Sequence, residues 1–237
     1  MYGNGIYFNI VTDNGSKMTQ FYQDGRTYIE ARDKSNFKIR LQNTTSGRVK
    51  VILSVDGLNI ISGNRATPNS EGYLVNGFET ITVDGWRISS QELRKFFFTT
   101  KKNSYNKKTG NDTSNIGVIG MLAYREVVNI PFIGYNQLVS GSYGRLSDSM
   151  ITNCSYSSNS VATSVAELKS TRSLGTGMGE VKQSVVQRVD AKWEANPFSN
   201  MEIFYKTRRQ LENMGIRVIP VREQQVPSAF AGFCKQV

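Results

Sequence analysis

Apolar and polar residues alternate with a period of two along several short stretches of the first 135 residues. In FKIRLQN, residues 37–43, Phe37, Ile39 and Leu41 fall on one side and polar residues on the other. The same alternation recurs in RVKVILSV, residues 48–55. Because the side chains of a β-strand point alternately to its two faces, the pattern predicts strands with one buried face.

Turn signals separate these stretches. Asp24 with Gly25, and Asn76 with Gly77, each lie between apolar runs and predict two β-hairpins. Ser89 and Glu92 have capping-box spacing, which predicts a single helical turn. The longer apolar run NIGVIGMLAYREV, residues 115–127, predicts a central strand buried on both faces, with close backbone approach at its glycines.

The alternation ends near residue 135, and this sets the predicted organisation. Residues 1–135 predict a mainly β domain, an antiparallel, jelly-roll-like β-sandwich. Residues 136–180 are rich in Ser, Gly, Asn and Thr and predict an extended or flexible segment. Residues 181–221 predict a strand–helix–strand unit that packs back on the sandwich. Residues 222–237 predict a C-terminal arm, with Phe230 and Phe233 docking on a partner.

The composition lowers the expectation of an enzyme. The chain of 237 residues contains no histidine, which removes Ser-His-Asp and Cys-His chemistry and His-ligated zinc. Its two cysteines, Cys154 and Cys234, have no metal-like spacing and are expected to be free thiols, with a disulfide as the alternative. We therefore expect no catalytic activity, no cofactor and no metal.

Basic residues outnumber acidic ones by 29 to 19, a net charge of +10 that favours anionic partners. The densest basic cluster is KKNSYNKK, with Lys101, Lys102, Lys107 and Lys108. It predicts either a solvated loop or a loop that contacts phosphates, and the second would make binding steeply salt-dependent. The chain shows neither a signal-peptide pattern nor an apolar run of about 18 residues, so we expect no membrane segment.

The tripeptide Val-Asp-Gly occurs twice, each time after a predicted strand. Asp56 with Gly57, and Asp84 with Gly85, are therefore expected to form structural turns, and Asn59 lies close to the first. One alternative is a catalytic carboxylate pair, which requires Asp56 and Asp84 to converge. Another is a calcium site formed by Asp56, Asn59 and Asp84.

Two further motifs each allow two interpretations. We expect Trp86 to plug one end of the sandwich and Arg87 to hold a loop, whereas a ligand-binding module would expose Trp86 beside Tyr73 as a stacking platform. The glycines of LGTGMGE, residues 174–180, lack the full dinucleotide-binding spacing. They predict a flexible, close-packed turn in preference to a phosphate cradle.

The segments SVDGLN, DGWR, NIGVIGMLAYRE and LGTGMGE together resemble a family of largely uncharacterised bacterial and phage proteins, over about residues 28–215. That family carries the same motifs in the same order, with His or Gly after LGTG, and here Met178 stands where His is expected. The resemblance implies a virion structural protein of a tailed phage, an auxiliary or decoration protein of the capsid.

That resemblance implies assembly in the host cytoplasm, followed by location in the virion. The expected partners are the major capsid protein, other virion proteins or further copies of the chain, with nucleic acid a less favoured partner. A tail- or portal-associated virion protein and a carbohydrate- or ligand-binding β-sandwich module are the alternatives. The scaffold interpretation predicts that Trp86 is buried, and the ligand-binding interpretation predicts that it is exposed.

Overall fold

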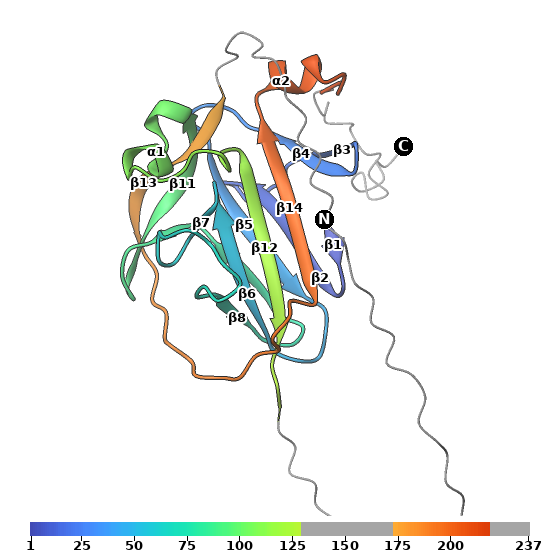
Figure 1. The fold of residues 1–237 in the computed structure, drawn as a ribbon, viewed down its shortest axis with the longest axis vertical. Coiled ribbons are helices and arrows are strands. Elements are labelled where there is room, and N and C mark those ends of the chain that lie inside the picture. Colours follow the sequence, from blue (N-terminus) through green and yellow to red (C-terminus); the bar gives the residue numbers. More distant parts are fainter. Residues whose placement is uncertain (129–172, 219–237) are drawn as a thin grey trace, which may run out of the picture. The chain divides into compact units, whose positions relative to one another are not determined.

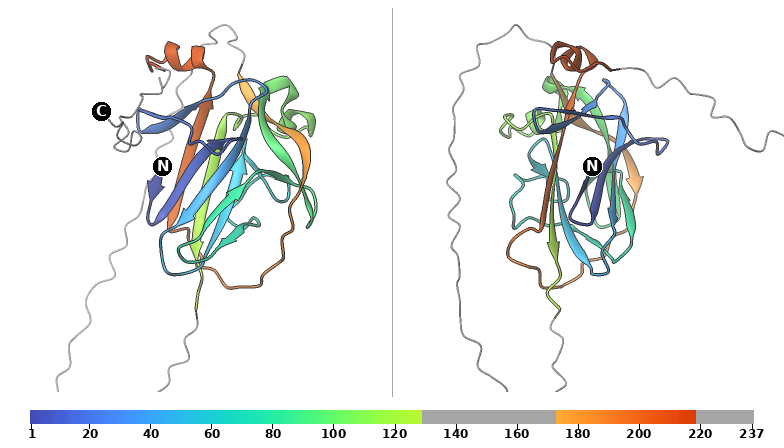
Figure 2. Two further views of the ribbon diagram at one scale, coloured as in Figure 1. Left: turned by 180° about the vertical axis from the view of Figure 1, so that it is seen from behind. Right: turned by 90° about the vertical axis from the view of Figure 1, so that its right-hand side faces the viewer.

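The computed structural model describes residues 1–128 and 173–218, which form two facing β-sheets (Figure 1). The sequence-based prediction of a mainly β protein with a sandwich architecture is confirmed. Figure 2 shows the two layers from the side. Most of the Ser-rich segment predicted at 136–180 lies outside the described residues, as do Cys154, Cys234, Phe230 and Phe233.

The first sheet contains seven strands in the order β1-β2-β5-β11-β10, with β9 beside β5 and β13 beside β11. All its described pairings are antiparallel. Its strands are β1 (Tyr2–Gly3), β2 (Ile6–Thr12), β5 (Asn36–Asn43), β9 (Thr80–Val83), β10 (Gly85–Arg87), β11 (Glu92–Thr100) and β13 (Leu174–Gln183).

The second sheet has the order β3-β4-β14-β12-β6-β7, with β8 beside β6. It is antiparallel except between β4 and β14, which run parallel, so the purely antiparallel prediction is wrong at this pair. Its strands are β3 (Gln20–Gln23), β4 (Arg26–Glu30), β6 (Val49–Val55), β7 (Leu58–Asn59), β8 (Tyr73–Val75), β12 (Val118–Arg125) and β14 (Ser199–Lys206).

Residues after 173 complete the sandwich instead of packing onto it. β14 lies between β4 and β12 inside the second sheet, and β13 is hydrogen-bonded along the length of β11. This differs from the expected domain boundary at residue 135. The physical reason is that strand pairing joins segments distant in sequence, and local alternation carries no information about which strands pair.

The helix after β14 is short and packs on the outer side of β4 and β14, at one end of the second sheet (Figure 1). α2 (Arg208–Asn213) begins at the capping box of Thr207, and Gly215 follows it with a φ of +83°. Leu211 and Ile216 pack there against Tyr28 of β4. The predicted strand at residues 216–221 does not begin in its described part, 216–218.

Two of the predicted local elements are wrong and one is correct. Asp24 and Gly25, with φ of +50° and +71°, join β3 to β4 as a hairpin. Asn76 and Gly77 do not form a hairpin, because β8 and β9 belong to different sheets. The expected helical turn at Ser89 is a strand connection: its hydroxyl accepts from the Glu92 amide, and Glu92 already begins β11.

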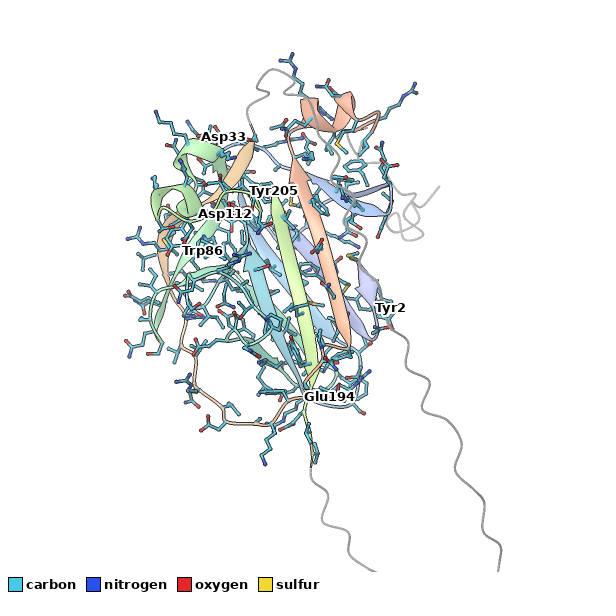
Figure 3. All side chains as sticks on the ribbon, viewed as in Figure 1. Tyr2, Asp33, Trp86, Asp112, Glu194 and Tyr205 are labelled. Carbon is cyan, nitrogen blue, oxygen red and sulfur yellow. The ribbon has the colours of Figure 1, made fainter. Side chains whose placement is uncertain are left out.

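Aromatic rings pack against one another in the core, among them those of Trp86 and Tyr205, which Figure 3 labels. Phe37 stacks on Phe96 and Phe98, with ring centroids 5.1 and 4.3 Å apart. Phe98 contacts Tyr205 at 4.9 Å, and Trp86 meets Phe96 edge-on at 5.5 Å. Such rings contribute large buried areas, so this cluster is a main source of hydrophobic stabilisation. No helix in residues 1–128 or 173–218 is long and apolar enough to cross a membrane.

Candidate functional site

Asp56 is a buried carboxylate at the end of β6. Its Oδ1 accepts hydrogen bonds from the Tyr205 hydroxyl (2.5 Å) and the Gly117 amide (3.0 Å), and its Oδ2 accepts from the Thr176 amide (2.7 Å). The Tyr205 hydroxyl also lies 3.1 Å from Thr176 Oγ1. Three segments far apart in the sequence therefore meet at one carboxylate.

The backbone that presents Asp56 is a two-residue turn between β6 and β7. Asp56 and Gly57 have φ of +54° and +81°, the conformation of the turns that join tightly paired strands. A Cβ on Gly57 would lie 2.8 Å from the Cβ of Asn115. The position therefore favours glycine for two reasons, backbone conformation and close packing.

Burial sets the protonation of this site. Desolvation raises the pKa of Asp56 from 3.8 to about 6, against the opposing effect of the hydrogen bonds from Tyr205, Gly117 and Thr176, which favour the carboxylate. Burial and the adjacent carboxylate raise the pKa of Tyr205 well above its usual value. At neutral pH the tyrosine is therefore a donor to a largely ionised Asp56. With 1% of its surface exposed, Asp56 contacts no solution substrate.

Asp84 lies in extended backbone between β9 and β10, so the expectation of a turn at Asp84 and Gly85 is wrong. Its carboxylate binds the ammonium group of Lys182. A Cβ on Gly85 would lie 1.9 Å from the carbonyl oxygen of Arg94. The glycine in this second copy of the tripeptide therefore permits close approach of two strands, and no left-handed conformation is needed.

Trp86 is inside the sandwich. Its side chain is 1% exposed, and its Nε1 donates to the Gly177 carbonyl at 3.2 Å. Its ring also contacts Tyr105, with centroids 4.9 Å apart. The buried position matches the plug expected from the sequence and leaves no stacking surface at Trp86.

Arg87 extends from the same strand and holds the chain that follows β13. Its guanidinium donates to the Ser184 carbonyl and to Ser184 Oγ at 3.2 Å. It also donates to the Tyr73 hydroxyl at 3.4 Å. Tyr73 is thereby engaged within the protein, so the pair of Tyr73 and Trp86 forms no platform for a sugar.

All four motif side chains act on the segment containing β13. Asp56 binds the amide of Thr176, Trp86 the carbonyl of Gly177, Asp84 the side chain of Lys182, and Arg87 the residue after the strand ends. Among the described strands β13 pairs with β11 alone, so it forms a sheet edge. The two Val-Asp-Gly units thus secure an edge strand at two places.

The LGTGMGE segment is a strand, so the predicted flexible turn is wrong. A Cβ on Gly175 would lie 2.6 Å from Ser104 Cβ, and one on Gly177 would lie 2.5 Å from the Phe97 ring. These glycines therefore allow close packing of β13. The backbone between them binds Asp56 and Trp86, which is incompatible with a phosphate cradle at the same groups.

Asp56 and Asp84 do not form a catalytic pair. Their partners on β13, Thr176 and Lys182, are six residues apart, which corresponds to about 20 Å along a strand. A carboxylate pair with coupled proton affinities requires a separation of several ångströms. The convergence that the alternative of a catalytic carboxylate pair requires is therefore absent at these two residues.

The proposed calcium ligands are also engaged elsewhere. Asn59 is buried, its amide donates to the Glu71 carbonyl at 2.8 Å, and its oxygen accepts from the amides of Ile61 and Ser62. Within the described ranges no group of three or more His, Cys, Asp or Glu residues is placed to hold a metal ion.

The basic cluster forms a small structured protrusion, defined here as the lysine loop, residues 101–108. It contains a 3₁₀ turn (Lys101–Asn103) and the short helix α1 (Tyr105–Lys108). Lys101, Lys102, Lys107 and Lys108 are exposed, whereas Ser104 and Asn106 are buried. The side-chain Nδ2 of Asn106 donates to the backbone carbonyl of Asp56 at 2.6 Å, which ties the loop to the same buried site.

An open groove of about 600 Å³ lies beside α2. Its lining includes Lys17, Arg32 and Arg208 together with Asp13 and Glu30. Because both signs of charge are present and Arg32 already pairs with Glu30 at 3.1 Å, the groove does not select a ligand class.

Sequence reasoning missed the partners of the motif residues: Tyr205, Thr176, Lys182 and Asn106. One signal was available, because the alternation in MEIFYK puts Tyr205 on the same face as Met201 and Ile203. A tyrosine on a buried face usually finds a hydrogen-bond partner. The sequence did not indicate that the partner is Asp56, which lies 149 positions earlier.

Comparison with known proteins found no matching family model, no matching curated protein and no matching solved structure.

Proposed function

We propose that this chain is a non-catalytic structural protein that binds a phage capsid lattice and stabilises it, as an auxiliary or decoration protein. The observation that carries the proposal is what the motif residues do. Asp56, Asp84, Trp86 and Arg87 direct their polar atoms at the segment around β13. The residues that carry the family resemblance therefore have their polar atoms engaged within the sandwich.

Two further features support a scaffold over a catalyst. The sequence has no histidine, and the carboxylate with the raised pKa, Asp56, is enclosed by protein. A functional carboxylate in an enzyme has to reach its substrate within hydrogen-bonding distance. The virion assignment itself rests on the sequence resemblance, which names the major capsid protein, other virion proteins or further copies of the chain as partners.

The two alternative functions differ in what supports them. The carbohydrate-binding module loses its support at Trp86 and Tyr73, because both side chains are engaged internally. Attachment to a tail or portal uses the same rigid sandwich and differs only in location. The test therefore has to separate heads from tails.

The experiment is sedimentation of phage particles from a producing culture through a density gradient, with quantitative mass spectrometry of every fraction. We expect the chain to travel with intact particles at a fixed copy ratio to the major capsid protein. After heads and tails are separated, it should remain with heads. Recovery with tails would replace the capsid location by the tail or portal one.

Recovery only at the top of the gradient, as a small species, would contradict the proposal. The stabilising role has its own measurement, the temperature at which particles release their DNA. Particles that lack the chain should release DNA at a lower temperature, and addition of the purified chain should restore the original value. Heat-denatured chain is the control, because it keeps the charge and composition and loses the sandwich.

A further inference from the structure

The lysine loop presents four exposed positive charges. Lys101, Lys102, Lys107 and Lys108 form no salt bridge with any described residue. Residues 93–111, which include this loop, contain no acidic residue. The carboxylate of Asp112 is engaged by the amide and hydroxyl of Ser114.

Hydrogen bonds and the packing of one aromatic ring fix the backbone of the lysine loop. Ser104 Oγ donates to the Lys101 carbonyl at 2.8 Å and accepts from the Lys107 amide at 3.3 Å. The Tyr105 ring packs on Trp86, and the Lys101 amide donates to the Ser173 carbonyl at 3.0 Å. A fixed backbone reduces the conformational entropy that a binding partner would have to remove.

The surface of the loop fits a phosphate backbone better than a protein. Its exposed residues are the four lysines and Asn103, and none has an apolar side chain. Protein–protein interfaces have an apolar or aromatic centre and are depleted in lysine. Contacts to nucleic-acid phosphates are made by lysines and small polar groups and need no apolar centre.

We infer that the lysine loop is a sequence-independent binding site for the phosphate backbone of double-stranded DNA. This inference does not depend on the proposed role in a lattice, because it concerns a different surface and a different partner. Each lysine that neutralises a phosphate displaces condensed counterions, so the signature of the site is the salt dependence of binding. Base readout is not part of the inference.

The test uses the full chain and a fluorescently labelled DNA duplex of about 30 base pairs, with binding followed by anisotropy between about 50 and 200 mM KCl. The loop variant carries Lys101→Gln, Lys102→Gln, Lys107→Gln and Lys108→Gln. The control variant loses four other exposed cations that form no salt bridge within the described residues, Lys17, Lys192, Arg209 and Arg217, each replaced by Gln. Both variants remove the same charge, and unfolding curves establish that both are folded.

We expect the slope of log K against log [KCl] to become shallower by about 3 to 4 in the loop variant, since each phosphate contact contributes about 0.9. Over a fourfold change in salt, those contacts correspond to about a 100-fold change in affinity. The control should alter the slope by less than about 1. These results together would support the site.

Three outcomes would overturn the inference. The wild-type chain could fail to bind DNA at about 50 mM salt, or the two variants could lose affinity equally, which would assign the effect to net charge. The third is tighter binding to poly-glutamate than to DNA with the same dependence on the loop lysines, which would identify an acidic protein as the partner.

Discussion

Replacement of Asp56 by asparagine should change the way in which stability depends on pH. Asparagine has nearly the same size and tolerates the positive φ at this position, so the turn is preserved. It cannot ionise, however, and it offers only one acceptor oxygen where the carboxylate serves three donors. Asp56→Asn therefore removes the titration and leaves one buried donor without an acceptor.

The sign and the size of this pH dependence follow from the raised pKa of Asp56. Because the pKa of Asp56 in the folded protein is about 6 and its ordinary value is 3.8, the group contributes stability that is complete below 3.8 and is lost as the pH rises through 6. This difference corresponds to about 3 kcal/mol. Below pH 4 Asp56 is protonated and neutral like asparagine, so the expected signal is the change of the stability difference with pH and not its value at one pH.

The free energy of unfolding of the wild type, minus that of the Asp56→Asn variant, should therefore fall by about 3 kcal/mol between pH 4 and pH 7.5. Urea unfolding followed by circular dichroism at several pH values measures it. The matched control is Asp24→Asn, the same substitution at an exposed residue that also has a positive φ, and it should give no such trend. A stability difference that is constant with pH, or that rises with pH, would refute the reasoning.

Three other substitutions test separate packing arguments by the same urea assay. Tyr205→Phe removes the hydroxyl donor to Asp56 and should cost about 1–3 kcal/mol, and the pH at which Asp56 titrates should move upward, as read by NMR; an unchanged stability would contradict its role. Phe78→Gly should stabilise the protein by about 1 kcal/mol, because Phe78 is 71% exposed with a φ of +59°; a loss would show that the ring is needed for folding. Gly85→Ala should cost about 3 kcal/mol or prevent folding, because its Cβ would collide with the carbonyl of Arg94; wild-type stability would contradict the close approach.

The sequence predicted those features that depend on neighbouring residues. The alternation in residues 37–43 predicted β5, whose residues Phe37, Ile39 and Leu41 are buried as expected. The hairpin at Asp24 was predictable because its turn and both strands are contiguous. In each case the pattern and the structure arise from the same local geometry of the strand.

Features that depend on distant pairing were not predictable. Asn76 and Gly77 have the composition of a hairpin turn, yet the flanking strands pair with β6 and β5 in separate sheets. The tripeptide Val-Asp-Gly forms a turn at Asp56 and extended backbone at Asp84, because the second glycine is required by a neighbouring strand. Identical residues thus serve different purposes according to what packs against them.

The site at Asp56 depends entirely on residues that are distant in the sequence. Asp56 acquires its role from Gly117, Thr176 and Tyr205, which are 61, 120 and 149 positions away. No spacing rule links these positions in one sequence. The motif residues were recognisable from the sequence, whereas their common target, β13, became evident only from the fold.

Hydrogen exchange in β13 is the most direct measurement of the central claim, that the motif residues hold this edge strand to the sandwich. Native-state exchange measured by mass spectrometry compares Leu174–Gln183 with the central strand Val118–Arg125 and with the edge strand Gln20–Gln23. We expect β13 to exchange as slowly as the central strand in the wild type and to lose this protection in Asp56→Asn. Exchange as fast as that of the Gln20–Gln23 strand in the wild type would contradict the account.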